Sequence, residues 1–146
     1  MSLAATPARA LALNLRVCRT MGVKRLEDLQ AFQRADAFKL EVYRLANASE
    51  MARSDERYRS QLFDAAASVG ANIAEGWKRF SAAELCQFLR YARGSLEESL
   101  VWLNDGVARG YFDIATIASA LQLADQCGAT IIALWRSLQP FVKKGR

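Results

Sequence analysis

The stretch Gly76-Trp-Lys-Arg-Phe80, between two predicted helices, places two cations between two aromatic side chains. Cations contact phosphates and aromatic rings stack on unpaired bases, so this pattern is typical of a surface that binds nucleic acid. Cations on the following helix would extend such a basic face. The candidate nucleic-acid-binding residues are Lys78, Arg79, Arg90, Arg93 and Trp77. The alternative is that Trp77 and Phe80 fold back onto the core while Lys78 and Arg79 are ordinary solvated residues.

A second polar group, Asn72 and Glu75, lies in Asn72-Ile-Ala-Glu-Gly76, a stretch that is otherwise small and apolar. Buried polar groups need hydrogen-bond partners, so we expect both side chains to bond to a neighbouring helix or chain end. Acid–base catalysis would need a second convergent carboxylate and a pocket. We therefore predict a structural role for Asn72, Glu75 and Gly76, with Gly76 just past a helix end, where positive φ costs glycine little.

Most catalytic and metal chemistries lack their usual residues in this chain. Histidine is absent, which removes Ser-His triads, most zinc sites and the Glu-x-x-His pairs of di-iron bundles. The three cysteines form no CxxC pair, as expected for idle thiols in a reducing compartment, and no nucleotide-binding glycine motif occurs. We predict a cytoplasmic protein that is not an enzyme and has no metal and no cofactor.

The elements that position these residues are predicted to be helices, because apolar residues recur at spacings of three and four and no proline occurs between Glu27 and Pro140. Four helices are expected, at about 26–47, 55–76, 81–106 and 114–139, with a connection at 48–54. The fold class is all-α, an up-down-up-down antiparallel four-helix bundle over residues 22–140, since short connections favour antiparallel neighbours.

Two of these helices carry clear local signals. Ser81 and Glu84 have the spacing of a capping box at the start of the third helix. The fourth helix has a strict three–four repeat, and we expect Pro140 to end it. That repeat consists of Ile114, Ile117, Leu121, Ala124, Gly128, Ile131, Trp135 and Leu138.

The net charge of +5 over 146 residues comes entirely from the N-terminal part of the chain. Five basic residues and no acidic one precede Glu27, and the remainder holds 15 of each sign. Residues 1–21 are predicted to be a flexible or partly helical extension: a transit-type or weak signal segment, an expression remnant, or sequence upstream of a start at Met21. Residues 141–146 form a basic tail. No run of 18 apolar residues occurs, so we expect a soluble protein with no membrane contact.

The run Ser68-Val-Gly-Ala-Asn-Ile-Ala-Glu-Gly76, followed by Arg79, Ser81, Glu84 and Gly94-Ser95-Leu96-Glu97, resembles a family of bacterial four-helix bundles. That family includes the 23S rRNA intervening-sequence proteins and is similar to the accessory variability determinant of diversity-generating retroelements. The resemblance extends over about residues 22–140. It departs from the family at Gly70-Ala71, where Pro-Ser is more usual, and in the neutral charge of the body.

The resemblance implies a homopentameric ring without catalytic activity. In that group of proteins, the accessory members bind a reverse transcriptase and nucleic acid. The leading hypothesis is a homo-oligomeric, RNA- or DNA-associated accessory protein. The alternative is a protein-interaction scaffold, because the third helix carries a wide apolar face with Phe88, Tyr91 and Trp102.

Overall fold

A computed structural model describes residues 22–79 and 81–142. Within these residues a short 3-10 helix, η1 (Leu26–Asp28), is followed by α2 (Gln30–Ala48), α3 (Glu50–Ser54), α4 (Glu56–Lys78), α5 (Ala82–Ala108) and α6 (Ile114–Val142). The predicted N-terminal extension and the last residues of the basic tail lie outside the described part of the chain.

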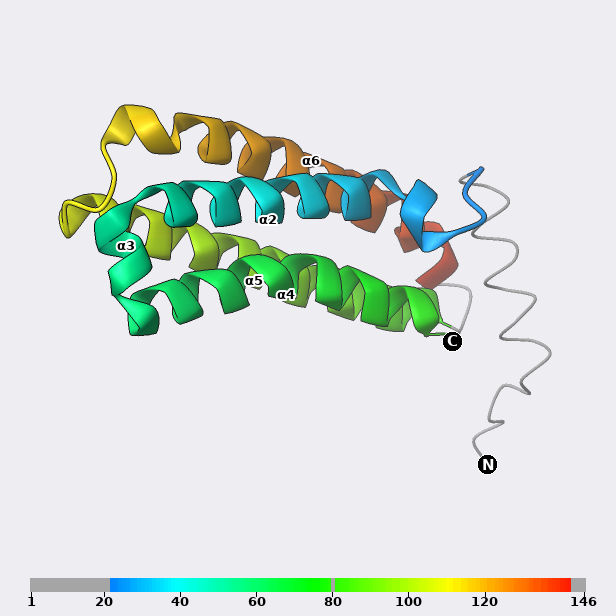
Figure 1. The fold of residues 1–146 in the computed structure, drawn as a ribbon. Helices are drawn as coiled ribbons and strands as arrows, with labels where there is room; N and C mark the ends of the chain where they lie inside the picture. Colours follow the sequence, from blue (N-terminus) through cyan, green and yellow to red (C-terminus); the bar gives the residue numbers. More distant parts are fainter. Residues whose placement is uncertain (1–21, 80, 143–146) are drawn as a thin grey trace.

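The four long helices form an up-down-up-down antiparallel bundle, which confirms the predicted fold class (Figure 1). Each long helix packs mainly on two neighbours: α2 on α4 and α6, and α5 on α4 and α6. The α3 corner and the turn from α5 to α6 lie at one end of the bundle, and the connection from α4 to α5 lies at the other (Figure 1). The core contains Phe38, Leu62, Ile73, Leu89, Leu103, Ile117, Ile131 and Leu138.

Side-chain caps begin three of the helices. Ser49 accepts a hydrogen bond from the Ala52 amide, Asp55 from the Tyr58 amide, and Ser81 from the Glu84 amide. An N-cap side chain satisfies an amide that has no partner within the helix. The Ser81 signal is thereby confirmed, and the expected connection at 48–54 contains the short helix α3, which the Ser49 cap starts.

The prediction that Gly76 lies just past a helix end is wrong. Gly76 is buried inside α4, which continues to Lys78, and its φ is not positive. A Cβ atom there would lie 2.7 Å from Phe88 Cβ and 3.0 Å from Leu85 Cδ1 of α5. Glycine is therefore needed at this position because α4 and α5 approach each other closely, not because of backbone conformation.

We expect Gly76→Ala to lower the free energy of unfolding by about 1–3 kcal/mol, because its methyl group overpacks the α4–α5 contact. Gly70 is the matched control in the same helix, since a Cβ there would lie at an ordinary 3.7 Å from Phe32. Gly70→Ala is expected to gain up to about 1 kcal/mol from alanine's helix propensity. Urea unfolding at one fixed protein concentration measures both values, and equal changes in the two variants would contradict the argument.

The predicted apolar seam of α6 is correct in part. Ile117, Ala124, Ile131 and Leu138 are buried, whereas Ile114 is 74% exposed because it lies at the helix start beyond the neighbouring helices. The buried face is completed by Ala120, Cys127 and Leu134, each of which comes one position before a residue of the predicted seam. Pro140 does not end the helix, which continues to Val142. Proline removes one intrahelical hydrogen bond, a loss that is small in the final turn.

By length and composition alone, α6 is long and apolar enough to cross a membrane. Of its most apolar 18-residue stretch, 33% is buried inside the bundle. In the bundle it packs along α2 and α5. A core helix passes the same test, so the result is weak evidence for a membrane span. Some of its apolar side chains, among them Leu121, Leu123 and Trp135, are only partly buried.

A group of polar and aromatic side chains, which we name the corner cluster, joins the α3–α4 corner to the turn between α5 and α6. Tyr111 donates a hydrogen bond to Asp55 Oδ2 at 2.6 Å, and Arg109 Nη1 lies 3.4 Å from the same oxygen. The Tyr58 hydroxyl donates to the backbone carbonyl of Trp102. The corner cluster consists of Asp55, Tyr58, Trp102, Arg109 and Tyr111.

Acid is expected to weaken the bundle through Asp55. The hydrogen bond from Tyr111, followed by that from the Tyr58 amide, lowers the pKa of Asp55 below its ordinary value. A carboxyl group whose pKa is lower in the folded state stabilises the fold above its unfolded pKa, near 3.9. That contribution is lost as the pH falls through the folded pKa.

The measurement is the urea midpoint between about pH 2 and 7. Asp55→Asn keeps an N-cap acceptor without the titration. The difference between the wild type and Asp55→Asn should therefore shrink below about pH 4, and a difference that is constant with pH would contradict this role.

Candidate nucleic-acid interface

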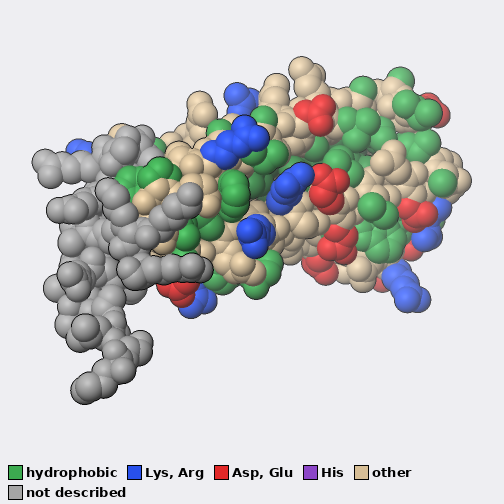
Figure 2. All heavy atoms as spheres, turned by 180° about the vertical axis from the view of Figure 1, so that it is seen from behind, with side chains coloured by type: hydrophobic (Ala, Val, Ile, Leu, Met, Phe, Trp, Pro, Cys, Tyr) green, Lys and Arg blue, Asp and Glu red, His purple; other side chains and the backbone are tan. Residues whose placement is uncertain are grey.

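Three arginines line a groove between α5 and α6, which we name the arginine groove. It is a cavity of about 430 Å³ with an apolar floor. Figure 2, which views the bundle from behind, shows Lys and Arg side chains gathered among hydrophobic ones. The groove is lined by Leu89, Arg90, Arg93, Ile131, Ile132, Trp135 and Arg136.

Helical spacing explains how the sequence builds this groove. Residues three or four apart share one side of a helix, so Arg90 and Arg93 point from α5 to the same side. On α6 the same spacing aligns Ile131 with Trp135 and Ile132 with Arg136. Leu89 and Ile131 are buried beneath the arginines and form the floor. Trp135 is partly buried against the core, and the Arg90 guanidinium carbon lies 6.0 Å from the centroid of its ring.

The three arginines of the arginine groove form no ion pair within the part of the chain that the structure describes. Among the ion pairs of the described residues, none involves Arg90, Arg93 or Arg136, and no acidic residue lines the groove. Arg44 and Arg109, by contrast, pair with carboxylates at 2.6 Å. Unpaired guanidinium groups beside an apolar surface attract anions that carry an apolar or aromatic part.

The structure places the predicted loop residues away from this groove. Trp77 packs partly buried against the core, Lys78 is the exposed last residue of α4, and Phe80 lies outside the described residues. Arg79 forms an ion pair with Glu75 at 2.9 Å and lies 5.1 Å from the centroid of the Phe88 ring. Whether Lys78, Arg79 and Trp77 bind nucleic acid stays a prediction.

Phe88 separates these residues from the arginine groove. Its Cβ faces Gly76 of α4. Arg90 is two residues further along α5, a rotation of about 200°, and faces α6. The basic residues predicted for one face are therefore divided between two sides of α5. Arg90 and Arg93 are brought together with Arg136, which sequence reasoning missed although it follows Trp135 of the predicted seam.

The polar motif of α4 has mainly structural contacts. Asn72 Nδ2 donates to Ser95 Oγ of α5 at 3.4 Å, as expected for a bond to a neighbouring helix. Glu75 differs from the expectation, because its carboxylate is 43% exposed and pairs with Arg79 of its own helix end. Arg79 also lies 4.0 Å from Glu84. Glu75 therefore shares the guanidinium of Arg79 with Glu84, and all three side chains are in contact with water. This arrangement is typical of a surface ion pair rather than of an acid–base site.

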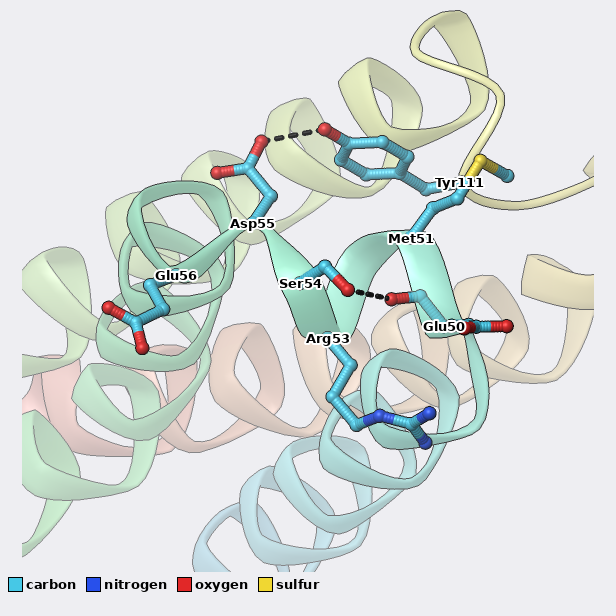
Figure 3. A pocket seen from close by; sticks show the side chains of 7 residues that line it. All are labelled: Glu50, Met51, Arg53, Ser54, Asp55, Glu56 and Tyr111. Atoms are coloured by element: carbon cyan, nitrogen blue, oxygen red, sulfur yellow. Dashed lines mark hydrogen bonds between the residues drawn. The ribbon is translucent and has the colours of Figure 1, made fainter.

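A larger concavity of about 790 Å³ lies at the opposite end, beside α3 (Figure 3). Two hydrogen bonds join its lining residues: Tyr111 donates to Asp55, and the Ser54 hydroxyl donates to the Glu50 carbonyl (Figure 3). Three acidic residues and one arginine line it, so it does not favour a polyanion. The lining residues are Glu50, Met51, Arg53, Ser54, Asp55, Glu56 and Tyr111.

The thiols of the described residues are poorly suited to nucleophilic chemistry. Cys86 and Cys127 are free and buried. Burial raises the pKa of Cys127 to about 12 and also raises that of Cys86. A thiol with a raised pKa carries little of the reactive thiolate at neutral pH. In the part of the chain that the structure describes, no three Cys, Asp or Glu side chains are grouped to hold a metal ion.

Comparison with known families gives one match. Residues 27–133 match the family described as 23S rRNA-intervening sequence protein. This range covers the bundle from the 3-10 helix to the middle of the arginine groove on α6. No curated protein matches the chain.

Proposed function

Since the chain belongs to the 23S rRNA-intervening sequence protein family, we propose that it is a non-enzymatic, homo-oligomeric bundle that associates with RNA as an accessory protein. The observation that carries the RNA role is the arginine groove, with three arginines for which the described residues show no ion pair. The family description names an intervening sequence of 23S rRNA, and a polyanion with aromatic bases fits the chemistry of the groove. The proposed compartment is the cytoplasm, where its thiols would stay reduced.

The test compares RNA binding across a salt series. The variant Arg90→Gln, Arg93→Gln, Arg136→Gln removes three charges from the groove, and Arg44→Gln, Arg53→Gln, Arg57→Gln removes three charges elsewhere. If the groove contacts three phosphates of a single strand, the slope of log K against log salt falls by up to about 2 in the groove variant only. Binding that is absent at low salt, or that both variants weaken equally, would refute the assignment.

The proposed homo-oligomer, with a pentamer as the expected form, is supported by apolar surface. Five large hydrophobic side chains are at least half exposed: Leu40, Met51, Tyr91, Val101 and Ile114. Assembly into an oligomer would cover such side chains where they lie together in one patch. Light scattering at micromolar concentration tests the proposal, and a monomer would refute it.

The second candidate function is a protein-interaction scaffold, with a reverse transcriptase or another protein as partner. It is favoured by Tyr91 and Val101, which are 50% and 65% exposed on the outer side of α5. If the protein is oligomeric, shows no salt-dependent RNA binding and keeps Tyr91 and Val101 accessible to solvent, the scaffold becomes the better account. The rate at which a maleimide labels a Val101→Cys variant in the oligomer measures that accessibility, since an exposed thiol reacts and a covered one does not.

A further inference from the structure

Arg90 of the arginine groove lies over an aromatic ring, an arrangement that ordinary phosphate binding does not need. The Arg90 guanidinium lies over the indole of Trp135, with 6.0 Å between its central carbon and the ring centroid. A distance of 6.0 Å is at the outer limit of a cation–π contact, so the guanidinium is not closed down onto the ring. Arg90 is exposed and its side chain is flexible, so it can move away to let a planar ring enter between the two groups.

We propose that the arginine groove holds one unpaired nucleotide, with its base between Arg90 and Trp135 and its flanking phosphates on Arg93 and Arg136; this assignment rests on the proposed RNA association. The cavity of about 430 Å³ lies within the range of small-molecule sites. Leu89, Ile131 and Ile132 give the base an apolar floor. A base within a duplex is stacked on both faces, so only an unpaired base can enter.

The donors of the groove suit the acceptors of a base. Its polar side chains are arginines and an indole, all of which donate hydrogen bonds and none of which accepts one. Every base carries acceptor atoms on its edge, such as the carbonyl oxygens of uracil. In a single strand these atoms are not occupied by base pairing, so the groove can bond to them.

The experiment measures the affinity of oligouridylate of about ten nucleotides, within the usual site size for single strands. The two comparison ligands are an RNA duplex with about ten nucleotides per strand and inorganic polyphosphate with the same number of charges as the oligouridylate. The inference predicts that oligouridylate binds at least about fivefold more tightly than either of them, because neither offers an unpaired base. Trp135→Leu should weaken oligouridylate binding at least fivefold without changing polyphosphate binding, and Trp135→Phe should restore most of the loss, because a phenyl ring still stacks.

A second variant keeps the test independent of the packing of Trp135. Arg90→Lys preserves the charge but removes the planar face. It should weaken oligouridylate binding several-fold and leave polyphosphate binding and the salt slope unchanged. Circular dichroism and light scattering confirm that each variant is folded and assembled.

The three possible failures are distinguishable. If RNA binds with salt dependence but oligouridylate and polyphosphate bind equally and Trp135→Leu has no effect, the nucleotide site is refuted and the RNA role stands. If oligouridylate binds no better than the RNA duplex, the requirement for an unpaired base is refuted. If no RNA binds at low salt, the proposed function fails together with this site.

Discussion

Replacing Tyr58 by alanine is expected to lower the free energy of unfolding by about 3–5 kcal/mol, the range for removal of a buried aromatic side chain. Tyr58 is 2% exposed and is the largest of the fully buried side chains. Its ring makes edge contacts with Trp102 and Tyr111, with centroids 5.9 and 5.1 Å apart. The substitution would open a cavity where the α3–α4 corner meets the end of α5.

Tyr58→Phe is the matched control for the ring. It removes only the hydroxyl that donates to the Trp102 carbonyl, and a single hydrogen bond contributes about 0.5–1.5 kcal/mol. Urea unfolding of both variants at one protein concentration separates packing from hydrogen bonding. If Tyr58→Ala costs no more than Tyr58→Phe, the ring does not hold the corner and this account of the corner cluster is wrong.

Gly106→Ala should be the second most damaging substitution, with an expected loss of at least about 2–3 kcal/mol, in the upper part of the range for overpacking. A Cβ atom there would overlap the Tyr58 hydroxyl oxygen and lie 2.7 Å from two ring carbons of Phe112. Gly94, on the same helix, has nothing within 4 Å of the position that a Cβ atom would take. Gly94→Ala is therefore expected to stabilise the protein by up to about 1 kcal/mol.

A double-mutant cycle identifies the atom responsible for the Gly106 effect. Tyr58→Phe removes the overlapping oxygen, so the double variant with Gly106→Ala should be less destabilised than the sum of the two single variants by at least about 0.5 kcal/mol. Strict additivity would mean that Phe112, and not Tyr58, limits the space at this position.

The four long helices and the N-cap at Ser81 could be predicted from the sequence because both depend on neighbours within one or two turns. The apolar spacing placed the four long helices, and Ser81 begins α5 as predicted. Gly76 and Gly106 could not be understood in the same way. Each is required by a side chain from another helix or turn, Phe88 or Tyr58 and Phe112, and sequence spacing carries no information on that distance.

The candidate site shows the same division. Arg90 and Arg93 were recognisable as cations on one helix, but Arg136 and Trp135 join them only because α5 and α6 pack antiparallel along their length. The aromatic and basic loop was conspicuous in the sequence, yet Trp77 packs against the core and Arg79 pairs with Glu75. Local composition could not distinguish a ring that covers the core from one that lines a groove.

The cyclic order of the helices has a consequence for folding kinetics. Contacts between α2 and α4, α4 and α5, and α5 and α6 join helices that follow one another in the chain, so they close short loops and form early. Of the four seams between long helices, that of α2 with α6 joins the two that are farthest apart in the chain, through pairs such as Arg34–Gln126 and Glu41–Ser119. Substitutions at that seam should chiefly speed unfolding, whereas those between α4 and α5 should slow folding.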